Sequence, residues 1–199
     1  MRKLSTNGYY LLKLETMKEN MQNKNYVFIA RSLDGYIADK KGGVDWLHSI
    51  PNPDGSDMGY NKFMERIDAI VMGRKTFEVV LGFGIPWPYK KHVFVVSNTL
   101  DDLTKDLIGN AEIVHGSTYE IIKKIKVKGF SNLYIDGGAL IQSFLKEDLI
   151  DEMIISTLPV LLGGGIPLFG ELSKPLEFEH VNSEVFLNAI TQDTYRRKR

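Results

Sequence analysis

The chain has 199 residues, and its 25 Lys and Arg are balanced by 25 Asp and Glu, so its formal net charge at pH 7 is zero. The hydrophobic fraction of 43% and charged fraction of 25% are typical of a globular protein, and the length favours one domain. The absence of cysteine excludes disulfides, thiolate zinc sites, thiol nucleophiles and iron–sulfur clusters. Zero net charge argues against a nucleic-acid partner, because neutralising phosphates requires a basic excess.

The two ends of the chain carry no clear targeting or membrane signal. The apolar stretch at 9–12 is followed by Lys13 and Glu15, too early for a secretory signal, and no apolar run is long enough for a membrane span. We expect a cytoplasmic protein in which residues 1–24 form an extension outside the fold and residues 25–199 form one domain. We expect the basic tail at 196–199 to be a solvated terminus rather than a nucleic-acid arm.

Short β-prone runs alternate with helical patterns along the chain. Strands are predicted over 26–31, 69–72, 92–97, 111–114, 133–135 and 150–158, and helices over 57–67, 76–81, 118–128 and 139–145. The segment 32–55 is predicted to be irregular, and 176–195 to be a hairpin turning at Asn188. This alternation indicates a three-layer α/β fold with a mainly parallel sheet that ends in antiparallel strands.

Three of the predicted strands end in glycine-rich or polar sequence. These ends are Gly73-Arg74-Lys75-Thr76, Ser97-Asn98-Thr99 and Gly137-Gly138. Ligands of open α/β sheets bind beyond the carboxyl ends of the strands, where glycines at helix starts offer free backbone N–H groups to anions. Each motif alone more often reflects close packing or a solvated ion pair. Their recurrence predicts a dinucleotide site, although the GxGxxG fingerprint of Rossmann folds is absent.

In this order, the motifs resemble those of dihydrofolate reductases. The similar segments are 71–78 (VMGRKTFE), 97–98 and 135–139 (IDGGA), while 32–38 (SLDGYIA) and 158–169 (LPVLLGGGIPLF) resemble the reductase domain of bifunctional riboflavin-biosynthesis proteins. The resemblance covers about residues 25–197. It implies a dihydrofolate reductase-like fold with an eight-stranded sheet, NADPH as cofactor, a small-molecule substrate and a homodimer.

The resemblance also implies which residues bind NADPH. It places Gly73, Arg74, Lys75 and Thr76 at the phosphates, Ser97 and Asn98 at the adenosine, Gly137, Gly138, Ala139 and Leu140 at the pyrophosphate, and Ala30 and Ile37 beside the nicotinamide. An Arg-Lys pair favours NADP over NAD, because the ribose of NAD more often meets a carboxylate.

Asp57 is the candidate proton donor on the substrate side. It precedes Met72 by 15 positions, similar to the spacing of the folate-site carboxylate in dihydrofolate reductases. On a shared helix face with Tyr60 and Met64, burial would raise its pKa. The open alternative is that Asp57 only caps its own helix.

The further substrate-binding candidates are Asp34, Tyr36, Trp46, Tyr60 and Ser156. For Asp34 the alternative is a structural Asp-Gly turn, and for Trp46 it is surface packing. No metal is expected, because the four histidines show no ligand-like spacing.

The chain departs from the riboflavin-pathway reductases in two places. Those enzymes tend to carry a basic residue where Tyr36 stands, and an Asp-Asn-Pro stretch with a later Arg where residues 78–87 read EVVLGFGIPW. The aromatic candidate residues suit a flat, uncharged heterocycle as well as they suit the phosphoribosylated pyrimidine of those enzymes. The expected function is hydride transfer to a C=N or C=O of a small heterocycle, with a non-catalytic NADPH-binding module and a structural protein as alternatives.

Overall fold

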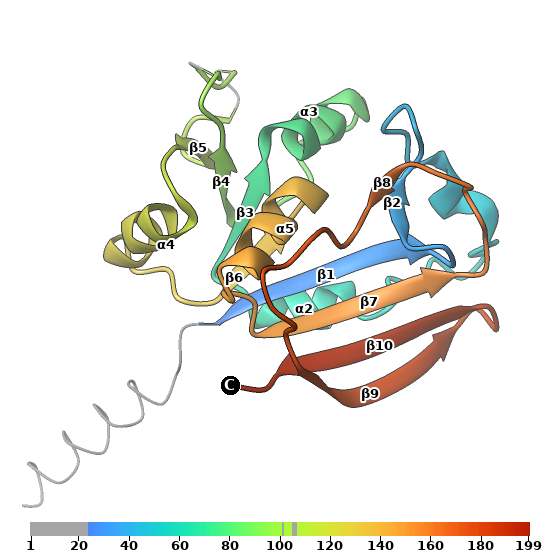
Figure 1. Ribbon diagram of the computed structural model, residues 1–199. Coiled ribbons are helices and arrows are strands. Elements are labelled where there is room, and N and C mark those ends of the chain that lie inside the picture. Colours follow the sequence, from blue (N-terminus) through green and yellow to red (C-terminus); the bar gives the residue numbers. More distant parts are fainter. Residues whose placement is uncertain (1–23, 101, 105–106) are drawn as a thin grey trace, which may run out of the picture.

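An eight-stranded sheet organises the molecule (Figure 1). The computed structural model describes residues 24–100, 102–104 and 107–199, so the expected extension at 1–24 lies, except for Lys24, outside the described residues. The strand order is β5 (Ala111–Val114), β4 (His92–Val96), β3 (Ala69–Gly73), β6 (Leu133–Asp136), β1 (Asn25–Ser32), β7 (Glu152–Leu158), β10 (Ile190–Arg197) and β9 (Phe178–Phe186). The strands from β5 to β7 are parallel and the last two pair antiparallel, as the sequence predicted.

Two hydrophobic clusters cover the two faces of this sheet. Helices α4 (Thr118–Val127) and α5 (Gly138–Lys146) pack on one face with Val71 and Ile135. On the opposite face, α2 (Tyr60–Glu65) and α3 (Arg74–Gly82) contribute to a cluster with Ile70, Met72 and Tyr134. Because β3 is buried on both faces, its sequence is continuously apolar rather than alternating.

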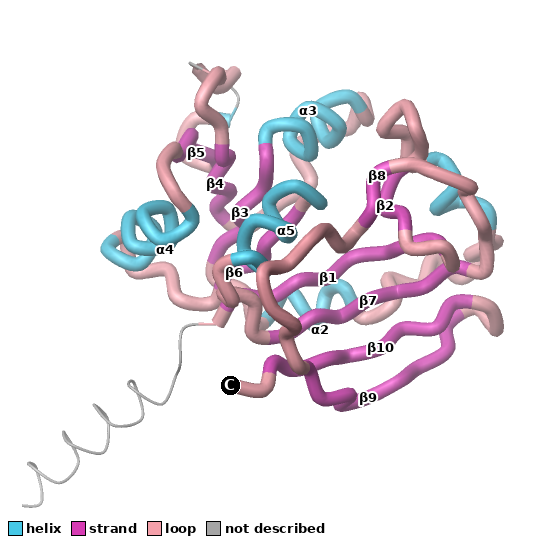
Figure 2. The backbone as a smooth tube through the Cα atoms, viewed as in Figure 1, coloured by secondary structure: helices cyan, strands magenta, loops and turns pink. Residues whose placement is uncertain are grey.

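The segment predicted to be irregular contains two short elements. Strand β2 (Tyr36–Ala38) pairs antiparallel with β8 (Ile166–Pro167), and a 3-10 helix, η1, spans Asp45–Ser49. Figure 2 shows that loops make up much of the chain around these elements. A Cβ on Gly165 would lie 2.1 Å from the Ala38 carbonyl oxygen, so only glycine allows this close crossing. Elements of two or three residues carry no periodic signal, which is why the sequence did not predict them.

The helix predicted from Asp57 begins later, at Tyr60. Gly59 precedes it in the left-handed region, with φ of 83°, and Met58 also has a positive φ of 50°. Two successive left-handed residues cannot belong to an α-helix, so Asp57 lies in the loop before α2.

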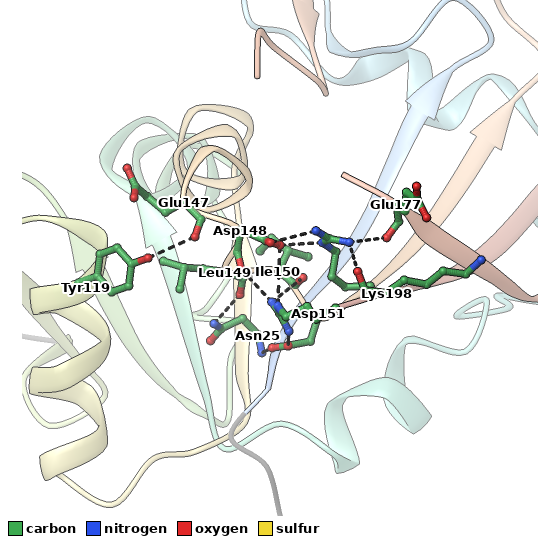
Figure 3. Close-up of polar contacts among 11 residues, drawn as sticks. Asn25, Tyr119, Glu147, Asp148, Leu149, Ile150, Asp151, Glu177 and Lys198 are labelled. Carbon is green, nitrogen blue, oxygen red and sulfur yellow. Dashed lines mark hydrogen bonds and ion pairs between the residues drawn. The ribbon is translucent and has the colours of Figure 1, made fainter. Parts of the chain in front are cut away.

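Three residues of the basic tail, Arg196, Lys198 and Arg199, are exposed as expected, but the side chain of Arg197 is largely buried. The Arg197 guanidinium donates two hydrogen bonds to the Asp148 carboxylate, at 2.7 and 2.9 Å, and another to the Glu177 carbonyl oxygen. Arg199 is paired with Asp151, whose other carboxylate oxygen accepts the Asn25 backbone N–H. Figure 3 shows these contacts converging on the turn between α5 and β7. Asp148 and Asp151 therefore hold the end of β10 against the start of β1 and β7.

Candidate functional site

The predicted cofactor segments lie at the carboxyl ends of β3 and β6, which are neighbours in the sheet. Gly137 has φ of 94°, and a Cβ there would lie 2.2 Å from the Thr76 Oγ1 atom. A Cβ on Gly138 would lie 2.6 Å from the Ile37 Cδ1 atom. The glycine pair therefore allows the start of α5 to approach both α3 and β2.

The starts of α3 and α5 differ from that of α4. Ser117 and Glu120 close the N-terminus of α4 with a complete capping box, whereas Gly73 and Gly137 provide no side-chain cap to α3 and α5. The first backbone N–H groups of these two helices therefore remain available to an anion, with the positive ends of both helix dipoles behind them.

The two cations predicted for the phosphates are exposed at the start of α3. Arg74 donates to the Glu78 carboxylate over 2.9 Å, one helical turn away. Lys75 is exposed and has no ion pair within the described part of the chain. Exposed pairs of this kind contribute little to stability, so a phosphate can replace Glu78 as the partner of Arg74 at small cost.

The other predicted cofactor residues follow β4 or begin α5. Ser97 is buried, and its Oγ accepts the backbone N–H groups of Thr99 and Leu100, which shapes the turn after β4. Asn98 and Ala139 are exposed. The side chain of Leu140, in contrast, is buried in the core beneath α5, so only its backbone can contact a ligand.

Asp57 does not have the buried helical position that we expected. Its carboxylate is exposed and accepts the backbone N–H groups of Gly59 and Asn61, at 3.0 and 2.9 Å. These hydrogen bonds lower the pKa of Asp57 below its usual value. The predicted rise in pKa is therefore wrong, because hydrogen bonding stabilises the ionised carboxylate at the start of α2.

Asp136 is a functional candidate that the sequence reasoning missed. It ends β6 on the same face as Tyr134, next to Met72 of β3 in the sheet register. Burial raises the pKa of Asp136 to about 6, while the Gly137 N–H and the Tyr134 hydroxyl partly oppose the shift. The available signal was an acidic residue directly after a buried strand and before a glycine pair.

Asp136 is surrounded by tyrosines. Tyr60 of α2, Tyr89 of the loop before β4 and Tyr134 all have a raised pKa, caused first by burial and next by the charge of Asp136. The Tyr60 ring packs edge-on against Phe28 of β1, with ring centroids 5.6 Å apart. The tyrosines therefore stay protonated. Tyr134 donates its hydroxyl proton to the Phe28 carbonyl oxygen over 2.9 Å, which leaves Tyr60 and Tyr89 as possible donors near a carboxyl group that titrates near neutrality.

A second polar group lies on the same face, across β1 from Asp136. Ala30 of β1, Ser156 of β7 and Gln192 of β10 are lateral neighbours. Ser156 and Gln192 are buried, whereas Phe28, Ala30 and Asp136 are partly exposed. This open part of the face lies at a switch point of the sheet, because α5 and α2, the α-helices that follow β6 and β1 in the chain, pack on opposite faces.

The remaining substrate candidates lie around the β2–β8 pair and η1. The Asp34 carboxylate accepts the Ser32 hydroxyl and the backbone N–H groups of Leu162 and Gly163, so the protein itself engages it, and its pKa is lowered. Tyr36 pairs with Pro167. The buried indole N–H of Trp46, in η1, has no acceptor within the described residues.

No helix in the described residues is long and apolar enough to cross a membrane. The same residues contain no cluster of three or more His, Asp or Glu side chains suited to a metal ion.

Known proteins share this fold, and some of them share part of the sequence. A crystal structure from Shewanella sp. PV-4, whose name assigns it provisionally to riboflavin biosynthesis, is 56% identical with a TM-score of 0.86, covering 88% of this chain and 99% of that chain. A Thermotoga maritima protein named as a diaminohydroxyphosphoribosylaminopyrimidine deaminase/5-amino-6-(5-phosphoribosylamino)uracil reductase is 16% identical with a TM-score of 0.71, covering 96% of this chain and 62% of that chain.

The fold is also that of a folate enzyme. Dihydrofolate reductase from Enterococcus faecalis, complexed with NADP(H), is 20% identical with a TM-score of 0.63, covering 89% of this chain and 98% of that chain. The family model of the RibD C-terminal domain matches residues 25–191. The expected resemblance is thereby confirmed, and the chain belongs to the RibD C-terminal domain family.

Proposed function

We propose that this protein is an NADPH-dependent reductase that delivers hydride to a C=N or C=O bond of a small heterocyclic substrate. One juxtaposition carries this proposal. Two uncapped helix starts meet at the Gly137–Thr76 contact, directly beside a carboxyl group with a pKa of about 6. Membership of the RibD C-terminal domain family supports the same function.

The residues present fit this cofactor. The backbone N–H groups after Gly73 and Gly137 can bind the pyrophosphate, and Arg74 and Lys75 can bind the additional phosphate of NADP. When bound, NADPH would supply the hydride. Ala30 leaves an open, partly exposed position on β1, on the same face of the sheet as Asp136 and next to Ser156, which suits a flat ring.

Asp136 is the group that can provide the proton for this reaction. As hydride adds to the carbon of C=N or C=O, the nitrogen or oxygen gains electron density and must take up a proton. A carboxyl group with a pKa of about 6 is partly protonated at neutral pH, and the protonated form donates. Asp57 is ionised under the same conditions because its pKa is lowered.

The cofactor part of the proposal predicts a binding preference. NADPH at about a hundred times its dissociation constant should raise the melting temperature by about 5–10 °C, and NADH should do so only at higher concentration. The double variant Arg74→Ala/Lys75→Ala should lose about tenfold or more of this preference, because it removes charged partners of the phosphate. Lys123→Ala/Lys126→Ala, which removes two exposed cations from α4, is the matched control.

The catalytic part is tested by NADPH oxidation, followed by absorbance, with 5-amino-6-(5-phosphoribosylamino)uracil and dihydrofolate as substrates. Turnover of either substrate supports a reductase. Tight NADPH binding without turnover of either would favour the non-catalytic module, and absence of any stabilisation by NADPH would contradict the proposal as a whole.

A further inference from the structure

The Gln192 side chain joins three parts of the candidate site. Its Nε2 atom lies 2.9 Å from the Ser156 Oγ atom and 3.1 Å from the Met58 carbonyl oxygen. Gln192 and Ser156 are 9% and 5% exposed, so these are well-shielded contacts on the face that carries Asp136. Met58 belongs to the loop before α2 and has a positive φ of 50°.

These contacts determine the orientation of the Gln192 amide. A carbonyl oxygen only accepts hydrogen bonds, so the atom facing the Met58 oxygen must be the nitrogen of Gln192. The second proton of the same nitrogen is then donated to Ser156. Both amide protons are thereby used by the protein, and the Gln192 Oε1 atom accepts no hydrogen bond from the described residues.

The orientation of Gln192 in turn fixes the role of Ser156. The Ser156 oxygen already accepts a hydrogen bond, and its proton has no acceptor within the described residues. Toward a ligand, Ser156 therefore presents a donor and Gln192 an acceptor. The two residues are lateral neighbours in the sheet, next to Ala30 in the open part of this face.

We propose that Gln192 sets the hydrogen-bonding polarity of the substrate site, so that the site selects a heterocycle with a lactam edge. Such an edge carries a carbonyl oxygen for the Ser156 hydroxyl and a neighbouring ring N–H for the Gln192 oxygen. The inference rests on the proposed reductase function, because it assigns the substrate to the face beside Asp136. Gln192 thereby acts as a specificity-determining residue, in part by positioning Ser156.

Two ring systems of the same shape but opposite polarity test this inference. Pterin carries a lactam edge, whereas the diaminopteridine in which an amino group replaces the carbonyl oxygen presents a donor and a ring acceptor there. Their affinities are measured by calorimetry on protein saturated with NADP+, so that binding is observed without turnover. Working at about pH 7, below the range in which the lactam N–H of pterin ionises, keeps that donor in place and leaves both rings uncharged.

The wild-type protein should bind pterin about ten- to a hundredfold more tightly than the diaminopteridine, because the reversed edge leaves buried polar groups unpaired. Gln192→Met should reduce this ratio to within about threefold. Ser156→Ala, which keeps the bond between Gln192 and Met58, should also reduce it and serves if Gln192→Met does not fold. Thr191→Met, at the exposed neighbouring position on β10, should leave the ratio unchanged.

The affinity ratio separates specificity from a merely structural role, because general loosening of the loop before α2 would weaken both ligands equally. The inference would be overturned if the wild-type protein bound the two rings equally tightly. It would also be overturned if neither ring showed saturable binding. Failure of NADP+ itself to bind would instead contradict the proposed reductase function.

Discussion

At the scale of single residues, two carboxyl groups near α2 have opposite environments. Asp57 is hydrogen-bonded and ionised, while burial keeps Asp136 partly protonated at neutral pH. Asp136→Asn should lower kcat by about a hundredfold or more, the usual contribution of a general acid, and leave the NADPH dissociation constant within about threefold. Asp57→Asn should change kcat only a few fold. A larger loss in Asp57→Asn than in Asp136→Asn would contradict the assignment.

The same residue predicts a pH dependence. Since the protonated form of Asp136 donates, kcat should fall as the pH rises through about 6, and Asp136→Asn should remove this step. The pKa of Asp136 in the unfolded chain lies near 3.8, so the folded state binds the proton more tightly and loses stability between about pH 4 and pH 6 as the group ionises.

Stability and activity should therefore change in opposite directions. At pH 7, Asp136→Asn should raise the free energy of unfolding by on the order of 2 kcal/mol, because the amide avoids the cost of a buried charge. Urea denaturation at about pH 5 and pH 7 measures this difference, which should be larger at the higher pH. A variant less stable than the wild type at pH 7 would show that Asp136 has favourable contacts in its ionised form.

Sequence reasoning proposed the candidate cofactor segments but not this carboxyl group. Glycines, cations and hydroxyls at strand ends are local signals, so positions 73–76 and 137–138 could be predicted from the sequence. The raised pKa of Asp136 comes from its burial, and Tyr60 and Tyr89, whose own pKa its charge raises, are distant in the chain and become its neighbours only in the folded protein. For Asp57, the helix start was predicted three residues too early, and the predicted rise in its pKa is a fall in the structure.

At the scale of elements, the junction of α3 and α5 depends on one glycine. Gly137→Ala adds the strain of a positive φ and a collision with Thr76, which should destabilise the protein by about 1–3 kcal/mol and weaken NADPH binding at least tenfold. Gly129→Ala is the matched control, because Gly129 has a similar φ of 92° but no atom within 4 Å of the added Cβ.

Melting temperatures with and without NADPH measure both effects of these substitutions. Gly129→Ala should lower stability but preserve the shift produced by NADPH, since it lies between α4 and β6, away from the carboxyl ends of the strands. Gly137→Ala should lose the shift. Equal NADPH binding by the two variants would mean that the approach of α5 to α3 does not shape the cofactor site.

The long elements of the fold were predictable and the short ones were not. The predicted parallel strands, helices α4 and α5 and the terminal hairpin are confirmed within a few residues, because their apolar patterns are continuous or periodic. In contrast, β2, β8 and the start of α2 depend on contacts such as Gly165 with Ala38, which join segments that are distant in sequence.

At the scale of the whole molecule, the C-terminal arginines connect the last strand to the first parallel strands. The Arg197 side chain is 9% exposed, and its ion pair with Asp148 lowers the pKa of that carboxyl group. Because the Arg197 side chain extends from β10 to the turn between α5 and β7, its contacts form only when elements distant in the chain have assembled.

Removing this connection should destabilise the protein as a unit. Arg197→Met should lower the free energy of unfolding by about 3 kcal/mol at pH 7, since it leaves Asp148 without its partner, whereas Arg196→Met, whose side chain is 48% exposed, should cost about 1 kcal/mol or less. Because the pKa of Asp148 is lowered by folding, the ion pair stabilises the folded state at a pH above the pKa of Asp148 in the unfolded chain. This stabilisation is lost as the pH falls through the pKa of Asp148 in the folded state. The difference in the free energy of unfolding between wild type and Arg197→Met, measured by urea denaturation, should therefore shrink below about pH 4. A difference that stays constant with pH would instead assign the effect to packing of the Arg197 side chain.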